Sequence, residues 1–129
     1  MMKMNSLLLI IIGILPTALF AQHPCTHSPA QPVIKKAAYP DAGFQLNPDS
    51  LTATENVWLE NGDHLTVKNR GCEYFALTFR FETRRFRHDA TDVAIWYRKS
   101  ITMMNNLLPT LDAPLNLSAG IDQLQQYVR

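Results

Sequence analysis

Between residues 51 and 83, apolar and polar residues alternate with the period of two that is typical of β-strands. The clearest row of alternating apolar residues ends this segment and consists of Phe75, Leu77, Phe79 and Phe81. Because successive side chains of a strand point to opposite faces, this row forms an apolar face that another layer must cover. Turn residues at Asn61-Gly62 and at 69–71 divide the segment. We therefore expect a small three-stranded antiparallel meander.

The length of the first turn decides which residues pair across it. A two-residue loop would place Trp58 opposite Leu65 and separate the aliphatic residues of the two strands. A three-residue loop of residues 60–62, with Gly62 in the left-handed region, pairs Val57 with Leu65 instead. We expect the three-residue loop, because it gathers the aliphatic residues on one face.

The spacing of apolar residues changes to a helical one after residue 88. Asp89 or Asp92 can cap the start of a helix, and Pro109 ends it. Its expected inner face consists of Val93, Trp96, Tyr97, Ser100, Met104, Leu107 and Leu108. Ser118 is the expected cap of a short final helix, whose inner stripe is Ile121, Leu124 and Val128. Strands followed by helices, without βαβ alternation, predict an α+β fold in which two C-terminal helices cover the sheet.

The first fifty residues follow neither period. Residues 1–21 have the order of a secretory signal peptide, with a positive charge at Lys3, a short apolar run and Ala21 before the expected cut. A retained anchor helix is the alternative, although the run is short for spanning a bilayer. Residues 22–50 are rich in proline and predict an extended arm that precedes a compact domain at 51–129. The expected location is therefore the periplasm or the outside of the cell.

The net charge, and the hydropathy of the chain after the leader, limit the classes of partner that we expect. The chain has 12 Lys and Arg against 11 Asp and Glu, and loss of the leader removes Lys3. A formally neutral domain is poorly suited to nucleic acid, which is bound through many phosphate contacts. No segment after the leader is apolar enough to predict a membrane span.

The two cysteines, Cys25 and Cys72, predict one disulfide in an exported chain. Such a bond would join the arm to the compact domain. The alternative is a metal site, because His23 and His27 flank Cys25, and thiolate with imidazole suits copper or zinc. Cleavage after Phe20 instead of Ala21 would also make His23 the third residue of a copper-binding N-terminus.

No catalytic or cofactor motif occurs, so we expect no cofactor and favour a function in binding over catalysis. The feature that stands out is the cluster Arg84, Arg85, Phe86 and Arg87 after the most apolar strand. Arginine beside an aromatic residue is typical of interface centres, although charges at a strand end also discourage edge pairing. The sequence thus predicts an exported protein that binds a protein partner, such as an inhibitor, an immunity-type protein or an accessory subunit. The alternative is a metal-handling protein or small enzyme that uses the histidine and cysteine residues of the N-terminal arm.

Overall fold

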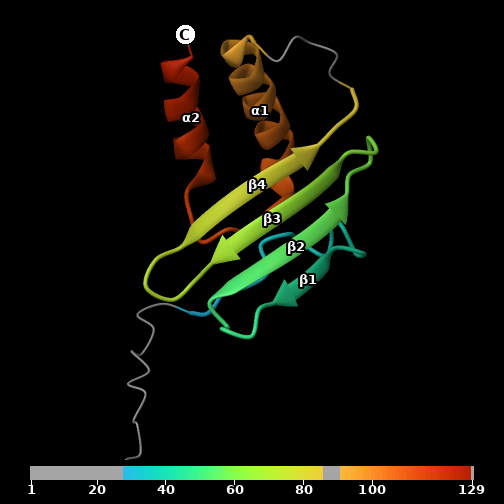
Figure 1. Cartoon of the computed structure of the whole chain (residues 1–129), viewed down its shortest axis with the longest axis vertical. Coiled ribbons are helices and arrows are strands. Elements are labelled where there is room, and N and C mark those ends of the chain that lie inside the picture. The colour runs from blue at the N-terminus through green and yellow to red at the C-terminus, as the bar shows by residue number, and fades with distance from the viewer. Residues whose placement is uncertain (1–27, 86–90, 129) are drawn as a thin grey trace, which may run out of the picture.

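The computed structural model describes residues 28–85 and 91–128. It shows an antiparallel sheet with two helices, which confirms the α+β class (Figure 1). The four strands pair in chain order and are β1 (Gly43–Leu46), β2 (Thr52–Trp58), β3 (His64–Arg70) and β4 (Ala76–Glu82). The helices are α1 (Val93–Leu107) and α2 (Leu117–Tyr127). The connection between them begins with a 3-10 turn, η1 (Leu108–Thr110). None of the helices within the described ranges is long and apolar enough to span a bilayer.

The sheet has one strand more than expected, so the prediction of a three-stranded meander was wrong. The additional strand is β1, which falls within the segment 22–50, where the sequence predicts an extended arm, and it pairs antiparallel with β2. Its four residues are too few for an alternating pattern to be recognised, and prolines 40 and 48 stand nearby. The backbone groups of β2 need hydrogen-bond partners, and β1 supplies them along the other edge of that strand.

The first hairpin has the expected register. Val57 pairs with Leu65, and Gly62 has a positive φ of 83°. The Leu59 amide donates to the Asp63 carbonyl oxygen over 2.8 Å and closes the three-residue loop. The aliphatic residues of both strands therefore share one face, as the sequence predicts.

The second turn lies later than the expected 69–71, because β3 continues through Arg70. The backbone at Ser28 packs directly against Gly71, where a Cβ atom would stand 2.6 Å from the Ser28 carbonyl oxygen. That oxygen also accepts a hydrogen bond from the Cys72 amide over 3.0 Å. Gly71 is therefore required by a close backbone approach rather than by the turn itself.

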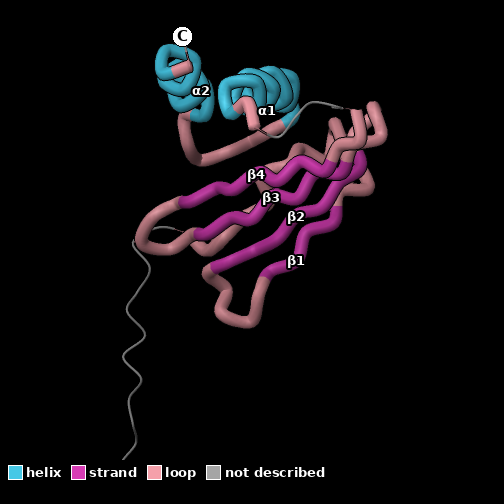
Figure 2. The backbone as a smooth tube through the Cα atoms, turned by 45° about the horizontal axis from the view of Figure 1, so that its top comes forward, coloured by secondary structure: helices cyan, strands magenta, loops and turns pink. Residues whose placement is uncertain are grey.

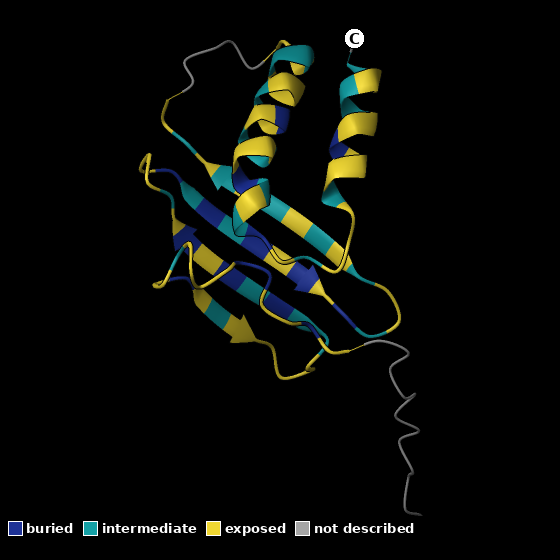
Figure 3. Cartoon of the chain, turned by 180° about the vertical axis from the view of Figure 1, so that it is seen from behind, coloured by how far each residue is buried: buried dark blue, intermediate teal, exposed yellow. Residues whose placement is uncertain are grey.

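The core lies between one face of the sheet and the chain that crosses it. The segment 28–42 crosses this face together with the end of α1 (Figure 3). Its amides at Val33 and Ile34 donate to the buried carboxylate of Glu55, and the Asp112 amide donates to the Val33 carbonyl oxygen over 2.7 Å. The buried members of the core cluster are Val33, Ile34, Ala42, Val57, Leu65, Val67, Leu107 and Leu111.

The helices pack on each other and cover the sheet only in part. In Figures 1 and 2 they lie side by side on one face, and the start of α1 and the end of α2 extend beyond the sheet. The apolar row of β4 is accordingly half-buried rather than enclosed. The helices cover this face of the sheet as expected, but the coverage is incomplete.

Two details of the helices differ from the sequence prediction. The expected inner face of α1 was wrong in its first half, because Val93, Trp96 and Tyr97 are exposed, whereas the unpredicted Ile101 is buried. The physical reason is that α1 begins beyond the end of the sheet, so that its first turns are covered only in part. Asn116, rather than Ser118, caps α2 by accepting from the Ala119 amide. The cap of α1 is Asp92, which was one of the two expected.

Candidate binding surface

The predicted patch divides into residues with different roles. Arg84 and Arg85 follow β4 and are described, whereas Phe86 and Arg87 lie outside the described residues. Arg85 forms a two-point ion pair with Asp63, with Nη2 2.5 Å from Oδ2 and Nε 3.3 Å from Oδ1. Arg84 is exposed and points to a neighbouring hollow that it lines. The two arginines are therefore not equivalent, although the sequence places them together.

The Asp63 carboxylate is buried at the end of the hairpin and faces Arg85. Burial raises the pKa of this group, but hydrogen bonds from Arg85 and Thr83 and the arginine's charge outweigh burial and lower the pKa overall. Because the Arg85 side chain is 48% exposed, solvent weakens the attraction between the two groups. The pair joins the first hairpin to the end of β4, which is a structural role.

Arg84 borders a hollow of about 650 Å³ at the end of the sheet, where β2, β3 and β4 meet the first turns of α1. We call it the Trp58–Trp96 hollow, because these two rings belong to its lining. Trp58, His64 and Glu82 are neighbours across the three strands, and the rings of Trp58 and His64 lie 4.8 Å apart between centroids. The full lining is Trp58, Gly62, His64, Phe81, Glu82, Thr83, Arg84 and Trp96.

The aromatic rings of this hollow are open to solvent. Trp58 is 71% exposed and Trp96 is 37% exposed. Tryptophan and arginine are the residues that contribute most often to the energetic centres of protein interfaces. An exposed apolar surface bordered by polar groups, here Arg84 and Glu82, is typical of interaction sites. The hollow therefore has the composition of a docking surface.

Sequence reasoning missed both tryptophans. Trp96 was assigned to the inner face of its helix, and Trp58 was used only to choose a register. The available signal was the alternation along β2. Its buried residues alternate with solvent-facing ones, and Trp58 falls among the solvent-facing positions. A large aromatic side chain at a solvent-facing position of a strand is a candidate binding residue, as an exposed arginine cluster is.

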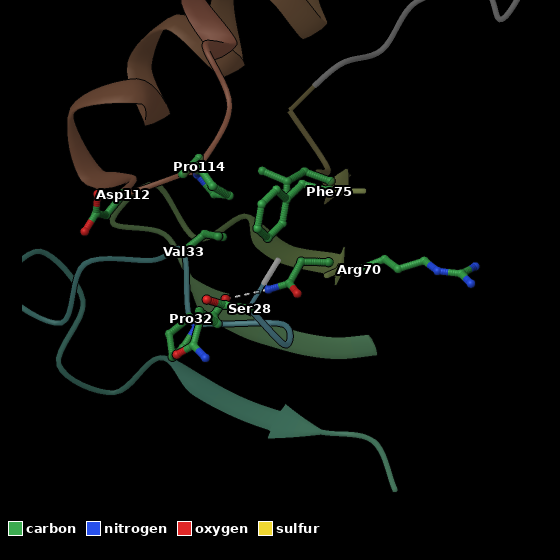
Figure 4. A pocket seen from close by; sticks show the side chains of 11 residues that line it. Ser28, Pro32, Val33, Arg70, Phe75, Asp112 and Pro114 are labelled. Atoms are coloured by element: carbon green, nitrogen blue, oxygen red, sulfur yellow. Dashed lines mark hydrogen bonds between the residues drawn. The ribbon is translucent and has the colours of Figure 1, made fainter. Parts of the chain in front are cut away.

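A second hollow, of about 290 Å³, lies where the segment 28–33 meets the second turn and the loop before α2 (Figure 4). Phe75, Val33 and Pro114 face one another across it, whereas the charged ends of Arg70 and Asp112 point away. Catalysis requires polar groups that converge on one point. This hollow suits a small apolar group and offers no such arrangement.

The metal and disulfide predictions fall mainly on residues outside the described ranges, namely His23, Cys25 and His27. Within the described ranges, no group of three or more potential ligands comes together and no cysteine is a free thiol. The contact between Cys72 and Ser28 brings the chain to within three residues of Cys25. Three residues span about 10 Å at most, so a bond between Cys25 and Cys72 stays a prediction that this contact supports.

No family model, curated protein or solved structure matches this chain. The surfaces of the chain itself are therefore the basis on which a function can be inferred. Of those described above, the Trp58–Trp96 hollow alone combines exposed aromatic rings with an arginine and a carboxylate.

Proposed function

We propose that this is an exported protein that binds a protein partner through the Trp58–Trp96 hollow, with Arg84 at its rim. The observation that carries the proposal is the presence of two exposed tryptophan rings in one hollow beside an unburied arginine. Inhibitors, immunity-type proteins and accessory subunits all act by such docking.

The hollow fits this role because the fold determines where its two rings stand. Trp58 stands at the end of a paired strand, against His64, and Trp96 stands in the first turns of a capped helix. A ring that is already oriented loses little conformational freedom when a partner covers it. Covering such a ring contributes about 2 kcal/mol or more at an interface centre.

Arg84, rather than the whole arginine cluster, should determine the charge preference of the site. Arg85 is already engaged by Asp63, and reversing its charge would place two carboxylates together at a buried position. Arg84 can be reversed without disturbing that pair. An acidic group of the partner opposite Arg84 would be favoured by simple charge complementarity.

The test is affinity capture from the producing cells with a C-terminally tagged protein, followed by mass spectrometry of bound proteins. We expect one stoichiometric partner, whose affinity falls about thirtyfold with Trp58→Ala and clearly with Arg84→Glu. Tyr127→Ala is the matched control, because Tyr127 is 82% exposed on α2 and lies outside the hollow's lining. Equal loss of the partner from all three variants would refute the role of the hollow.

The same eluate tests the alternative function and export. One copper or zinc ion per chain without a protein partner would overturn the binding proposal in favour of metal handling by His23, Cys25 and His27. The mass of the exported chain should begin at Gln22, as cleavage after Ala21 requires. An intact leader on exported material would contradict cleavage.

A further inference from the structure

The sheet has a second face, turned away from the helices, that carries an unequal distribution of charge. Figure 2 shows α1 and α2 on one side of the sheet and no helix on the other. The more exposed residues alternate with buried ones in β2 and β3 and with half-buried ones in β4, so every second side chain points to this outer face. We define the outer face as Thr52, Thr54, Asn56, Trp58, His64, Thr66, Lys68, Arg70, Ala76, Thr78, Arg80 and Glu82.

Three of these residues are cationic and one is anionic. Lys68 and Arg70 follow each other on β3, and Arg80 lies diagonally from Lys68 on β4. The spacing is about 7 Å along the strand and about 7 Å across the diagonal. Glu82 pairs with Arg80 over 3.3 Å, but both side chains stay more than half exposed. The outer face is therefore net positive, although the whole chain is nearly neutral.

The acidic groups that balance this charge lie elsewhere. Glu55 and Asp63 are buried. Asp49, in the turn before β2, accepts hydrogen bonds from the amides of Leu51 and Thr52, which chiefly lower its pKa, with a small contribution from the charge of Arg70. Asp49 thus touches only the margin of the outer face near Arg70. Lys68 has threonines as its cross-strand neighbours.

Two of the cations, Lys68 and Arg70, line a shallow hollow of about 340 Å³. Its side chains are mostly hydroxyls, amides and cations, and its lining is Asn47, Thr52, Ala53, Thr54, Lys68, Asn69, Arg70, Ala76 and Thr78. Exposed aromatic rings stand at both ends of the face. Trp58 is at one end, and Tyr74 is at the other, where the Arg70 guanidinium lies 5.1 Å from its ring centroid.

We propose that the outer face binds an acidic polysaccharide, with Lys68, Arg70 and Arg80 contacting carboxylates repeated along the sugar chain. The cations supply charge complementarity, and the threonine hydroxyls match sugar hydroxyls as both donors and acceptors. Flat aromatic rings at the ends can pack on the apolar faces of sugar rings. An acidic peptide fits less well beside Lys68, because the lining of the shallow hollow there includes no large apolar side chain that could anchor it. This inference rests on Lys68, Arg70 and Arg80, none of which lines the Trp58–Trp96 hollow, although Trp58 belongs to both surfaces.

The test is isothermal titration of the purified protein with polygalacturonate at low and moderate salt. We expect measurable binding that weakens as salt is added, because the contacts are between exposed charges. Lys68→Glu should weaken binding about tenfold, since it replaces an attraction with a repulsion, and Lys68→Arg should preserve it. Arg98→Glu is the matched control, because it makes the same change of charge on the exposed surface of α1. It should change the affinity by less than about twofold.

Two further probes distinguish a polysaccharide from other polyanions. Polyglutamate and oligodeoxythymidylate carry similar charge on a peptide and on a nucleic acid. Absence of polygalacturonate binding would overturn the proposal, and so would equal or tighter binding of either probe. Equal effects of Lys68→Glu and Arg98→Glu would also overturn it. Trp96→Ala should leave polygalacturonate binding unchanged, so this result and the partner capture can fail independently.

Discussion

The buried carboxylate of Glu55 should be a principal attachment of the segment 28–42 to the sheet. Glu55 is 2% exposed, and its two oxygens accept from the amides of Val33 and Ile34 over 2.9 and 3.1 Å. No salt bridge engages this carboxylate within the described residues. Its charge is therefore stabilised by backbone amides, and those amides have lost water in exchange.

Glu55→Gln keeps the size of the side chain and replaces one acceptor oxygen with a donor nitrogen. One of the two amides then meets a donor instead of an acceptor, which costs about 1 to 3 kcal/mol for an unsatisfied buried group. The remaining hydrogen bond loses its charge assistance, which removes about 1 kcal/mol more. We expect a total destabilisation of about 2 to 4 kcal/mol, at the upper end of ordinary single substitutions.

Urea denaturation followed by circular dichroism measures this loss. With a slope of about 1.5 kcal/mol/M, a loss of 3 kcal/mol lowers the midpoint by about 2 M. Amide hydrogen exchange adds a local measurement, since protection at Val33 and Ile34 should fall more than protection in β3. Glu60→Gln is the control, because this substitution makes the same chemical change at an exposed turn. A loss below about 0.5 kcal/mol, with unchanged exchange at those amides, would refute the reasoning.

Three other predictions follow from the contacts described. Arg85→Met should destabilise the protein by about 1 to 2 kcal/mol at pH 7, discounted for the exposure of Arg85. Because the pKa of Asp63 is lowered in the folded state, this stabilisation is present above its ordinary value near 3.8 and is lost as the pH falls through the folded value. Denaturation at pH 7 and pH 3 should show that the difference in free energy of unfolding between variant and wild type is smaller at pH 3. An equal difference at both pH values would contradict the role of the Arg85–Asp63 pair. Phe79→Ala should lower the free energy of unfolding by about 2 kcal/mol, less than for an enclosed ring, because Phe79 is partly buried; no change would mean that the helices leave this row uncovered in solution. Cys25 and Cys72 should resist alkylation until a reductant is added, and rapid labelling of the native protein would disprove the bond.

Local chemistry explains which parts of the fold the sequence could predict. The hairpin register followed from a turn residue with positive φ and from the need to gather aliphatic residues, and both requirements lie within a few residues of each other. The cap of α1 was one of two aspartates that the sequence offered, because capping depends on one side chain and its own helix. By contrast, β1 is a strand only because β2 has an open edge beside it. The exposed half of α1 depends on where the sheet ends, which the helical spacing does not encode.

The site was harder to predict because its members come together across the sheet. The arginine cluster is contiguous in the sequence, yet the structure separates Arg85, which faces Asp63, from Arg84, which lies beside Trp58 and Trp96. Those tryptophans are distant in sequence and have no common motif. Each would be ordinary alone, since single exposed apolar residues are common on protein surfaces. The hollow that they share with Arg84 distinguishes them.

The distribution of charge over the fold also decides whether a nearly neutral chain can bind a polyanion. Near-neutral composition argues against binding of a polyanion only if the charges are mixed evenly over the surface. In this sheet the period of two turns Lys68, Arg70 and Arg80 outward, whereas Glu55 points to the core and Asp63 is buried at the hairpin end. The buried carboxylates are matched by backbone amides and by Arg85, so they stabilise the fold without neutralising the outer face. Net charge is therefore a property of the whole chain, and the relevant quantity for binding is the charge that each face presents.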